Sequence, residues 1–351
     1  MNTSKNIVYL YSEVMPYAIA VMRALVKDLG YKVDCICWDQ NKRTPFVPQD
    51  EEGITYHKRS GFTKESIIRF IEERNPPLMY IVGRMDPLYL ETVLHFKHKC
   101  RIVTGSDNQW LGTQKQKIAT VLSPILYQKY FEYFWVPGPR QYEFARRMGY
   151  PTNKIIWNHL TGDSDIFNKS FTDNMPIREK SYPHKMVFAG RFTKVKGLDI
   201  LMEAFTAAKK ETKNDWELLL IGSGEVPVSK ESFIVVKDFM SGEAMARESK
   251  DWGVFCLPST KEPWGVVIHE FTMAGLPIIC SDSVGAADTL VINNYNGFVF
   301  KTGDVLALKN TILKIMSMSD QELLTMGARG HDLAQMHNPS IAAHSLVSAI
   351  R

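Results

Sequence analysis

The chain has 351 residues and a formal net charge of +4, with 45% hydrophobic and 23% charged residues. This composition is typical of a globular protein with room for two domains, and it argues against a disordered or fibrous chain. No uncharged apolar run reaches the roughly 18 residues that a membrane-spanning helix needs.

The chain begins with Met1–Lys5, a stretch that is too short and too polar for a secretory signal. Five cysteines in mostly apolar surroundings predict buried, reduced thiols rather than a disulfide framework or a zinc site. We therefore expect a cytoplasmic protein, and association with the inner face of a membrane is an open alternative.

Short apolar runs alternate with helical stretches through the first half of the chain. The expected strands are residues 6–11, 32–38, 78–82, 101–104, 134–137 and 154–157, and the expected helices are residues 16–29, 66–73 and 88–97. Such alternation is typical of a parallel sheet covered by helices on both faces. We predict a Rossmann-like domain over residues 1–170.

A polar stretch with two prolines, residues 168–184, is predicted to link this domain to a second one. The alternation then restarts, with expected strands at 185–189, 217–221, 233–236, 253–258, 277–281 and 297–300, and expected helices at 197–210, 243–249, 265–274, 305–316, 320–335 and 340–350. We predict a second Rossmann-like domain over residues 185–335. The final residues, 336–351, are predicted to form a helix, and packing of this helix back on the first domain is an open possibility.

Glycines and cations follow two of the strands expected in the second half. Gly190, Arg191 and Lys196 lie between the strand at 185–189 and the next helix, where free amides and the helix dipole favour an anion. Arg191 could grip phosphate oxygens through its planar fork, and Lys196 adds a second charge. The alternative is that both cations are simply solvated. Gly222 opens a similar turn but is a weaker signal by itself.

A loop and helix from Glu262 to Gly275 carry the densest chemistry. If the helix begins at Gly265, Glu270 lies about 7.5 Å further along its axis. The amides of Gly265, Val266 and Val267 would then be free to meet a diphosphate between two carboxylates, each able to accept from vicinal hydroxyls. The alternative is that Glu262 is a loop charge and that Glu270 is paired on its helix.

These motifs resemble the donor site of retaining GT-B glycosyltransferases, family 4 (glycosyl transferases group 1). The matching segments, in the family's order, are Gly190-Arg191 with Lys196-Gly197, Ile221–Gly224, Glu262-x7-Glu270 with Gly265, and Asn296–Phe298. The resemblance covers residues 185–316. It implies an α/β GT-B fold, in which two Rossmann-like, doubly wound domains face a central cleft.

The resemblance also implies a role for each matched residue. Arg191 and Lys196 would bind the donor diphosphate and stabilise the leaving nucleoside diphosphate, Glu270 would hold the ribose hydroxyls, and Glu262 would contact the donor sugar. The other implied donor-binding residues are Gly190, Gly222, Lys237, Phe239, Gly265, Val266 and Val267. No cofactor and no metal are expected, because cations and helix amides take the metal's place in this family.

The implied activity is transfer of a sugar, with retention of configuration, from a UDP- or GDP-sugar to an acceptor hydroxyl. The first domain would bind a saccharide or lipid-linked acceptor in polysaccharide or glycolipid assembly. Two other functions stay open: a non-catalytic subunit that binds nucleotide sugars, and a sugar-nucleotide epimerase on the same fold. No basic stripe interleaved with stacking aromatics indicates nucleic-acid binding.

The first half departs from the family pattern. Members often carry a histidine after the strand expected at 101–104, whereas this chain has Asp107. Asp107 is our candidate for a catalytic or sugar-contacting replacement, and capping of the next helix or turn is the alternative.

Charge and apolar residues in the first half raise a further possibility. Residues 1–170 carry a net charge of +6, and the remainder carries −2. Within them, Thr113–Phe134 mixes lysines with large apolar residues. Two interpretations stay open for this segment: it lies on an anionic membrane, or it is a buried helix with an exposed lysine edge.

Overall fold

The computed structural model describes residues 5–40 and 46–350, which form two compact units. Unit 1 comprises Met1–Thr161 and His337–Arg351, and unit 2 comprises Gly162–Met336. Of the polar start discussed above, Met1–Ser4 lies outside the described residues. Each unit contains one sheet whose paired strands are all parallel.

Unit 1 has a seven-stranded sheet in the order β3-β2-β1-β4-β5-β6-β7. Its strands are β1 (Asn6–Leu10), β2 (Lys32–Cys37), β3 (Ile54–Lys58), β4 (Leu78–Ile81), β5 (Arg101–Gly105), β6 (Tyr133–Trp135) and β7 (Ile155–Ile156). Its helices are α1 (Pro16–Lys27), α2 (Lys64–Arg74), α3 (Pro87–Phe96), α4 (Gln114–Val121), α5 (Pro139–Arg147) and α13 (Pro339–Val347).

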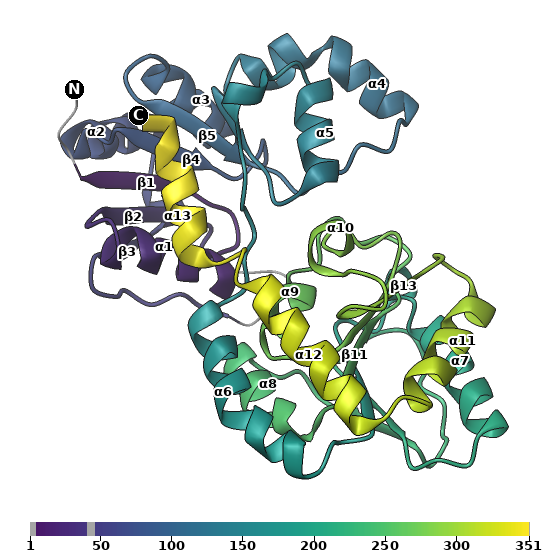
Figure 1. Ribbon diagram of the computed structural model, residues 1–351. Coiled ribbons are helices and arrows are strands. Elements are labelled where there is room, and N and C mark those ends of the chain that lie inside the picture. The colour runs from purple at the N-terminus through teal and green to yellow at the C-terminus, as the bar shows by residue number, and fades with distance from the viewer. Residues whose placement is uncertain (1–4, 41–45, 351) are drawn as a thin grey trace. The chain divides into compact units, whose positions relative to one another are not determined.

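Successive residues of each strand in unit 1 face opposite sides of the sheet, and helices cover both sides. Ile7 and Tyr9 pack in one core with residues of α1 and α13, whereas Val8 and Leu10 pack in another with residues of α2 and α3. Figure 1 shows α13 beside α1, although they come from opposite ends of the chain. The final helical segment is therefore part of unit 1.

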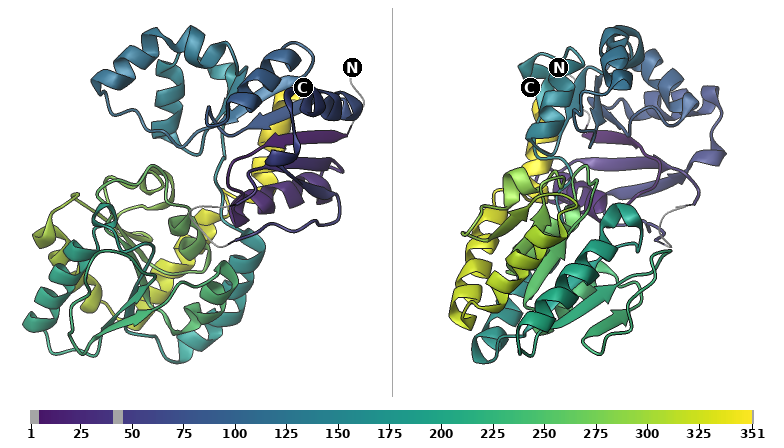
Figure 2. Two further views of the ribbon diagram at one scale, coloured as in Figure 1. Left: turned by 180° about the vertical axis from the view of Figure 1, so that it is seen from behind. Right: turned by 90° about the vertical axis from the view of Figure 1, so that its right-hand side faces the viewer.

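Unit 2 has a six-stranded sheet in the order β10-β9-β8-β11-β12-β13. Its strands are β8 (Lys185–Ala189), β9 (Glu217–Ile221), β10 (Ile234–Lys237), β11 (Val254–Leu257), β12 (Ile278–Ser281) and β13 (Gly297–Phe300). Its helices are α6 (Ser164–Lys180), α7 (Leu198–Glu211), α8 (Gly242–Glu248), α9 (Val266–Met273), α10 (Ala287–Leu290), α11 (Val305–Met316) and α12 (Asp320–Ala334). Helix α7 packs on α11, while α6, α9 and α12 pack together, and Figure 2 shows helices on both sides of this sheet.

The structure confirms the prediction of two Rossmann-like α/β domains but corrects the linker. Residues 168–180 are not a loop but part of helix α6. Asp163 caps the beginning of this helix, because its carboxylate accepts a hydrogen bond from the Ile166 amide. The helix escapes a search for apolar periodicity because its buried face is largely polar: Phe167, Ser170, Asn174 and Arg178.

Strand β3 and helix α5 were also missed by the sequence analysis, and both lie in unit 1. All five cysteines are free thiols, and four of them are buried, whereas Cys100 is partly exposed. Across the two described stretches of chain, no helix is long and apolar enough to cross a membrane.

The strand order of each sheet reverses direction next to its first strand. In unit 1 the chain moves outward from β1 to β3 and then returns to β4, and in unit 2 it moves from β8 to β10 and returns to β11. Loops after the carboxyl ends of these central strands diverge, which leaves a crevice where ligands bind in doubly wound sheets. The candidate site residues lie at these two places.

Candidate functional site

Loops that follow four neighbouring strands of unit 2 hold one another in place. The amide of Gly190, after β8, donates to Ile221 at the end of β9 at 3.0 Å. The amide of Thr260, after β11, donates to the carbonyl of Val195 at 2.8 Å, and the amide of Gly285, after β12, donates to Glu262 at 3.0 Å. Backbone hydrogen bonds therefore join the two predicted clusters at one edge of the sheet.

Lys196 and Glu262, predicted separately, lie in contact at this edge. The Lys196 ammonium, in a short 3-10 turn (Lys194–Lys196), donates to the Glu262 carboxylate, which also accepts from the Ser259 hydroxyl at 3.2 Å. The Glu262 side chain is only 13% exposed. Because both charges are partly withdrawn from water, each is held in one position rather than sampling solvent.

Helix α9 begins directly after this loop, at Gly265. Its φ of +95° is a backbone conformation that residues other than glycine rarely adopt, and no side chain caps the helix. The amides of Val266 and Val267 belong to the first turn, whose N–H groups have no partner within the helix. The beginning of α9 can thus accept an anion beside the Lys196–Glu262 pair.

Arg191 supplies a second cation at the same edge, on the loop after β8. Its side chain is exposed, and within residues 5–40 and 46–350 no carboxylate forms an ion pair with it. An exposed guanidinium on the loop after β8, the strand next to β11, is available for the oxygens of a diphosphate.

Glu270 lies one and a half turns further along α9, in a more enclosed setting. Burial, with a smaller contribution from the negative charge of Asp163, raises the pKa of the Glu270 carboxyl from 4.5 to about 7. Its side chain also lies close to Gly162, where an added methyl group would come within 2.9 Å of the Glu270 Cγ atom. The carboxyl is therefore poised between its neutral and charged forms near neutral pH.

This pKa predicts how nucleotide affinity depends on pH. If the charged carboxylate accepts from two ribose hydroxyls, as the resemblance implies, affinity for UDP or GDP should rise about tenfold between pH 6 and pH 8. Glu270→Gln should bind more weakly and lose this component of the pH dependence. Ionisation of the nucleotide phosphate is common to both proteins and cancels in the comparison, which isothermal titration calorimetry would measure.

The raised pKa of Glu270 also makes the stability of the folded protein depend on pH, in the direction opposite to nucleotide affinity. Burial favours the neutral Glu270 carboxyl in the folded state. The contribution of this group to the free energy of unfolding is therefore complete below about pH 4.5 and is lost as the pH rises through 7. The free energy of unfolding of Glu270→Gln should not show this loss. If the affinity of both proteins, or their free energy of unfolding, changed in the same way with pH, the raised pKa of Glu270 would be contradicted.

The remaining predicted donor residues are less closely joined to this cluster. The Gly222 amide donates to the carbonyl of Lys237 at 2.9 Å, so the backbones of these residues are adjacent. The Lys237 side chain pairs with Glu248 at 2.6 Å, and Phe239 is largely exposed. Among the described residues, the Lys237 ammonium does not contact Glu262. The base-binding role of Lys237 and Phe239 stays a prediction.

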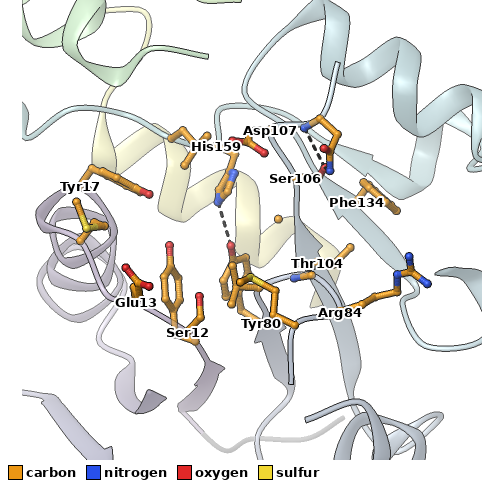
Figure 3. A pocket seen from close by; sticks show the side chains of 18 of the residues that line it. Ser12, Glu13, Tyr17, Tyr80, Arg84, Thr104, Ser106, Asp107, Phe134 and His159 are labelled. Atoms are coloured by element: carbon orange, nitrogen blue, oxygen red, sulfur yellow. Dashed lines mark hydrogen bonds between the residues drawn. The ribbon is translucent and has the colours of Figure 1, made fainter. Parts of the chain in front are cut away.

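Unit 1 has a pocket of about 630 Å³ at the corresponding edge of its own sheet (Figure 3). It is lined by the loops that follow β1, β4 and β5, and by residues near the end of β7; they include Ser12, Glu13, Tyr17, Tyr80, Arg84, Thr104, Ser106, Asp107, Phe134 and His159. Aromatic rings with carboxylate, guanidinium and hydroxyl groups suit a polar ligand that has apolar faces.

Asp107 lies at this pocket and does not cap the next helix. Thr113 caps α4 instead, by accepting from the Gln116 amide. The Asp107 carboxylate is near enough to Tyr80 to contribute to the raised pKa of that phenol, after the larger effect of burial. Capping of helix α4 by Asp107 is thus wrong, whereas capping of the turn after β5 and the catalytic role of Asp107 both stay predictions.

The pocket floor contains a buried histidine that the sequence analysis did not identify. The ring of His159 lies 4.4 Å from that of Trp135, and its Nε2 atom hydrogen-bonds the Tyr80 hydroxyl at 3.1 Å. Burial lowers the pKa of His159 from 6.5 to about 3, so the ring is neutral at physiological pH. A neutral ring gives the pocket floor a fixed shape without adding charge.

The absence of a side chain at Gly105 leaves space for the His159 and Tyr80 side chains, and this packing leads to a further prediction. An added Cβ atom at Gly105 would lie 2.6 Å from the His159 Cε1 atom and would also collide with the Tyr80 hydroxyl. Gly105→Ala should lower the free energy of unfolding by about 2 kcal/mol. Gly61→Ala is the control, because nothing lies within 4 Å of its Cβ position. Equal denaturant midpoints for the two variants would contradict this packing.

His269, next to Glu270, was also missed. The Gly162 amide donates to its Nδ1 atom at 2.8 Å, and its Nε2–H donates to the Ala334 carbonyl at 3.1 Å. These two backbone groups lie at the beginning and near the end of unit 2, so His269 ties helix α9 to both. The only sequence signal was a polar residue on a largely apolar helix, a pattern that is equally typical of a residue facing solvent.

No group of three or more His, Cys, Asp or Glu side chains that could hold a metal ion occurs in the described part of the chain. The expectation that no metal is needed stays a prediction.

The comparisons with known proteins agree with this geometry. Residues 172–330, which carry all of the donor motifs, match the family model Glycosyl transferases group 1. The chain is 27% identical over 157 residues to an uncharacterized glycosyltransferase of Methanocaldococcus jannaschii, covering 42% of each chain. It is 29% identical over 206 residues to the capsular polysaccharide biosynthesis glycosyltransferase CapM of Staphylococcus aureus, covering 51% of this chain and 53% of CapM. These matches span about half or less of the relatives' lengths.

Solved structures resemble nearly the whole chain. A glycosyltransferase from Rickettsia africae has a TM-score of 0.75 at 14% identity and covers 99% of this chain and 98% of its own. Anabaena HepE in complex with UDP and glucose has a TM-score of 0.70 at 14% identity, covering 98% of both chains. The fold is therefore that of the GT-B glycosyltransferases.

Proposed function

We propose that this protein is a retaining glycosyltransferase of family 4 that transfers a sugar from a UDP- or GDP-sugar to an acceptor hydroxyl. The observation that carries the proposal is the contact of Lys196 with Glu262 beside the uncapped beginning of α9. Its support comes from the motif resemblance, from the match of residues 172–330 and from the UDP-bound state of the structurally similar HepE. UDP is therefore the first nucleotide to test.

In this proposal the donor lies along the edge of unit 2. Arg191, Lys196 and the amides of Val266 and Val267 hold the diphosphate, Glu270 holds the ribose, and Glu262 holds the sugar. The bond from the anomeric carbon to the diphosphate oxygen breaks, and its electron pair stays on that oxygen. The cations stabilise this developing charge, which is the largest contribution such a site can make.

The acceptor is proposed to occupy the pocket of unit 1. Its hydroxyl attacks the anomeric carbon from the face that the diphosphate leaves, and its proton passes to the departing diphosphate oxygen. The aromatic and carboxylate lining suits the ring and hydroxyl groups of a saccharide, and Asp107 is the residue we assign to contact these hydroxyls. Relatives in capsular polysaccharide and O-antigen synthesis favour a role in polysaccharide or glycolipid assembly.

The test is to incubate the protein with UDP- and GDP-sugars, with and without a panel of saccharide and lipid-linked acceptors, and to analyse the products by mass spectrometry and NMR. The proposal predicts an acceptor-dependent glycoside with the anomeric configuration of the donor. Inversion of that configuration would overturn the retaining mechanism. An epimerised donor formed without acceptor would indicate an epimerase, and binding without turnover would indicate a non-catalytic subunit.

A further inference from the structure

One helical stretch of unit 1 turns its large apolar side chains toward solvent. We call these side chains the apolar ridge; they are between 43% and 79% exposed and belong to Leu111, Ile118, Val121, Leu122 and Ile125. Their spacing of three and four residues places most of them along one side of α4 and the turn that follows it. Helix α4 itself has no buried residue.

The opposite side of this stretch attaches it to unit 1 through small and polar residues. The Gln116 side chain donates to the Gln109 carbonyl at 2.7 Å, and the buried Ser123 hydroxyl donates to the Met148 carbonyl at 2.6 Å. Ala119 packs against the core between them. The usual pattern of a surface helix is thus inverted, with polar groups inward and the apolar ridge outward.

The charged residues within this stretch of the sequence have one sign. Lys115, Lys117 and Lys129 are exposed within the same stretch, and no acidic residue occurs between Asn108 and Phe131. A contiguous apolar surface with a cationic border differs from the scattered apolar residues of ordinary protein surfaces.

We propose that the apolar ridge docks on an anionic lipid bilayer. The stretch would lie in the plane of the interface, with its apolar side chains among the acyl chains and its lysines reaching back to the headgroup phosphates. Each lysine near such a surface contributes roughly fivefold to binding. The stretch carries lysines and no carboxylate, which favours an anionic lipid surface over a protein partner, since such a partner would need complementary acidic groups. This docking goes beyond sugar transfer and requires neither donor nor acceptor.

The test is co-sedimentation of the full chain with vesicles of phosphatidylcholine alone or mixed equally with phosphatidylglycerol. The unchanged protein should bind the anionic vesicles at least tenfold more tightly, and added salt should weaken this binding. Ile118→Ser with Ile125→Ser, and separately Lys115→Gln with Lys117→Gln, should each lower the affinity about tenfold or more. All four side chains are exposed, so these variants should keep their folded structure.

The controls change matched residues of unit 2. Leu306→Ser, on α11, removes an apolar side chain that is 62% exposed, and Lys210→Gln, on α7, removes an exposed lysine. Both should bind vesicles within twofold of the unchanged protein. Equal binding to both kinds of vesicle, or no loss in the ridge variants, would overturn the proposal. Concentration-dependent dimers that only the ridge variants abolish, with vesicle binding unchanged, would instead assign the surface to a second copy. None of these results depends on whether the protein transfers sugar.

Discussion

Replacing Lys196 with alanine should lower kcat/KM for the nucleotide sugar by about 100- to 1,000-fold. In the proposed mechanism, the substitution removes a cation from the place where the leaving diphosphate gains charge. It also leaves the Glu262 carboxylate, which is largely shielded from water, without its ammonium partner. Release of nucleoside diphosphate in the presence of acceptor would measure the effect.

Lys194→Ala is the matched control for this variant. Lys194 belongs to the same 3-10 turn but is exposed, and no contact joins it to Glu262 in the part of the chain that the structure describes. Its activity should stay within about twofold of the unchanged protein. If Lys196→Ala retained more than a fifth of the activity, or if both variants lost activity equally, Lys196 would have no specific role at the diphosphate.

The second large effect is on stability, at Arg178. Its guanidinium is buried and donates to the carbonyls of Ala274 and Ser249 at 2.9 and 2.7 Å, and to Gly275 at 3.2 Å. Arg178→Met should lower the free energy of unfolding by about 3–5 kcal/mol, because the carbonyls of Ala274 and Gly275 lose this donor inside the protein. The Ser249 carbonyl keeps the Trp252 amide as a donor at 3.2 Å. Urea unfolding followed by circular dichroism would measure the loss.

Lys180→Met tests whether this loss is specific. Lys180 is exposed near the end of the same helix, and its replacement should change the free energy of unfolding by less than about 0.5 kcal/mol. A loss below 1 kcal/mol for Arg178→Met would show that water or a rearranged loop can satisfy the carbonyls of Ser249, Ala274 and Gly275.

The parallel sheets were predictable because apolar runs bounded by turns mark buried strands. Strand β4, with four buried residues in succession, is such a case. Helix α6 was not predictable, because its buried face is completed by Ser170, Asn174 and Arg178. Asn174 and Arg178 find their partner, Ser249, 75 and 71 residues further along the chain. Buried polar residues of this kind have the same sequence pattern as a solvated linker.

The candidate site also has a part that the sequence predicts and a part that only the structure shows. The residues of the donor cluster follow single strands and occur in short motifs, so they could be found one by one. Their contacts could not be predicted, since Lys196 and Glu262 are 66 residues apart in the chain. The pocket of unit 1 is lined by loops that follow several strands. His159 could not be assigned to it from the sequence, because only the folded sheet places its loop beside Tyr80.

The central claim is that Arg191, Lys196 and the beginning of α9 together hold a nucleoside diphosphate. Isothermal titration calorimetry with uridine, UMP and UDP, and with the guanosine series, tests this claim most directly. The account predicts that one nucleotide series gains at least tenfold in affinity when the second phosphate is added, and that Arg191→Ala with Lys196→Ala abolishes this gain. If neither diphosphate binds, or if the second phosphate adds nothing in the unchanged protein, the claim is contradicted.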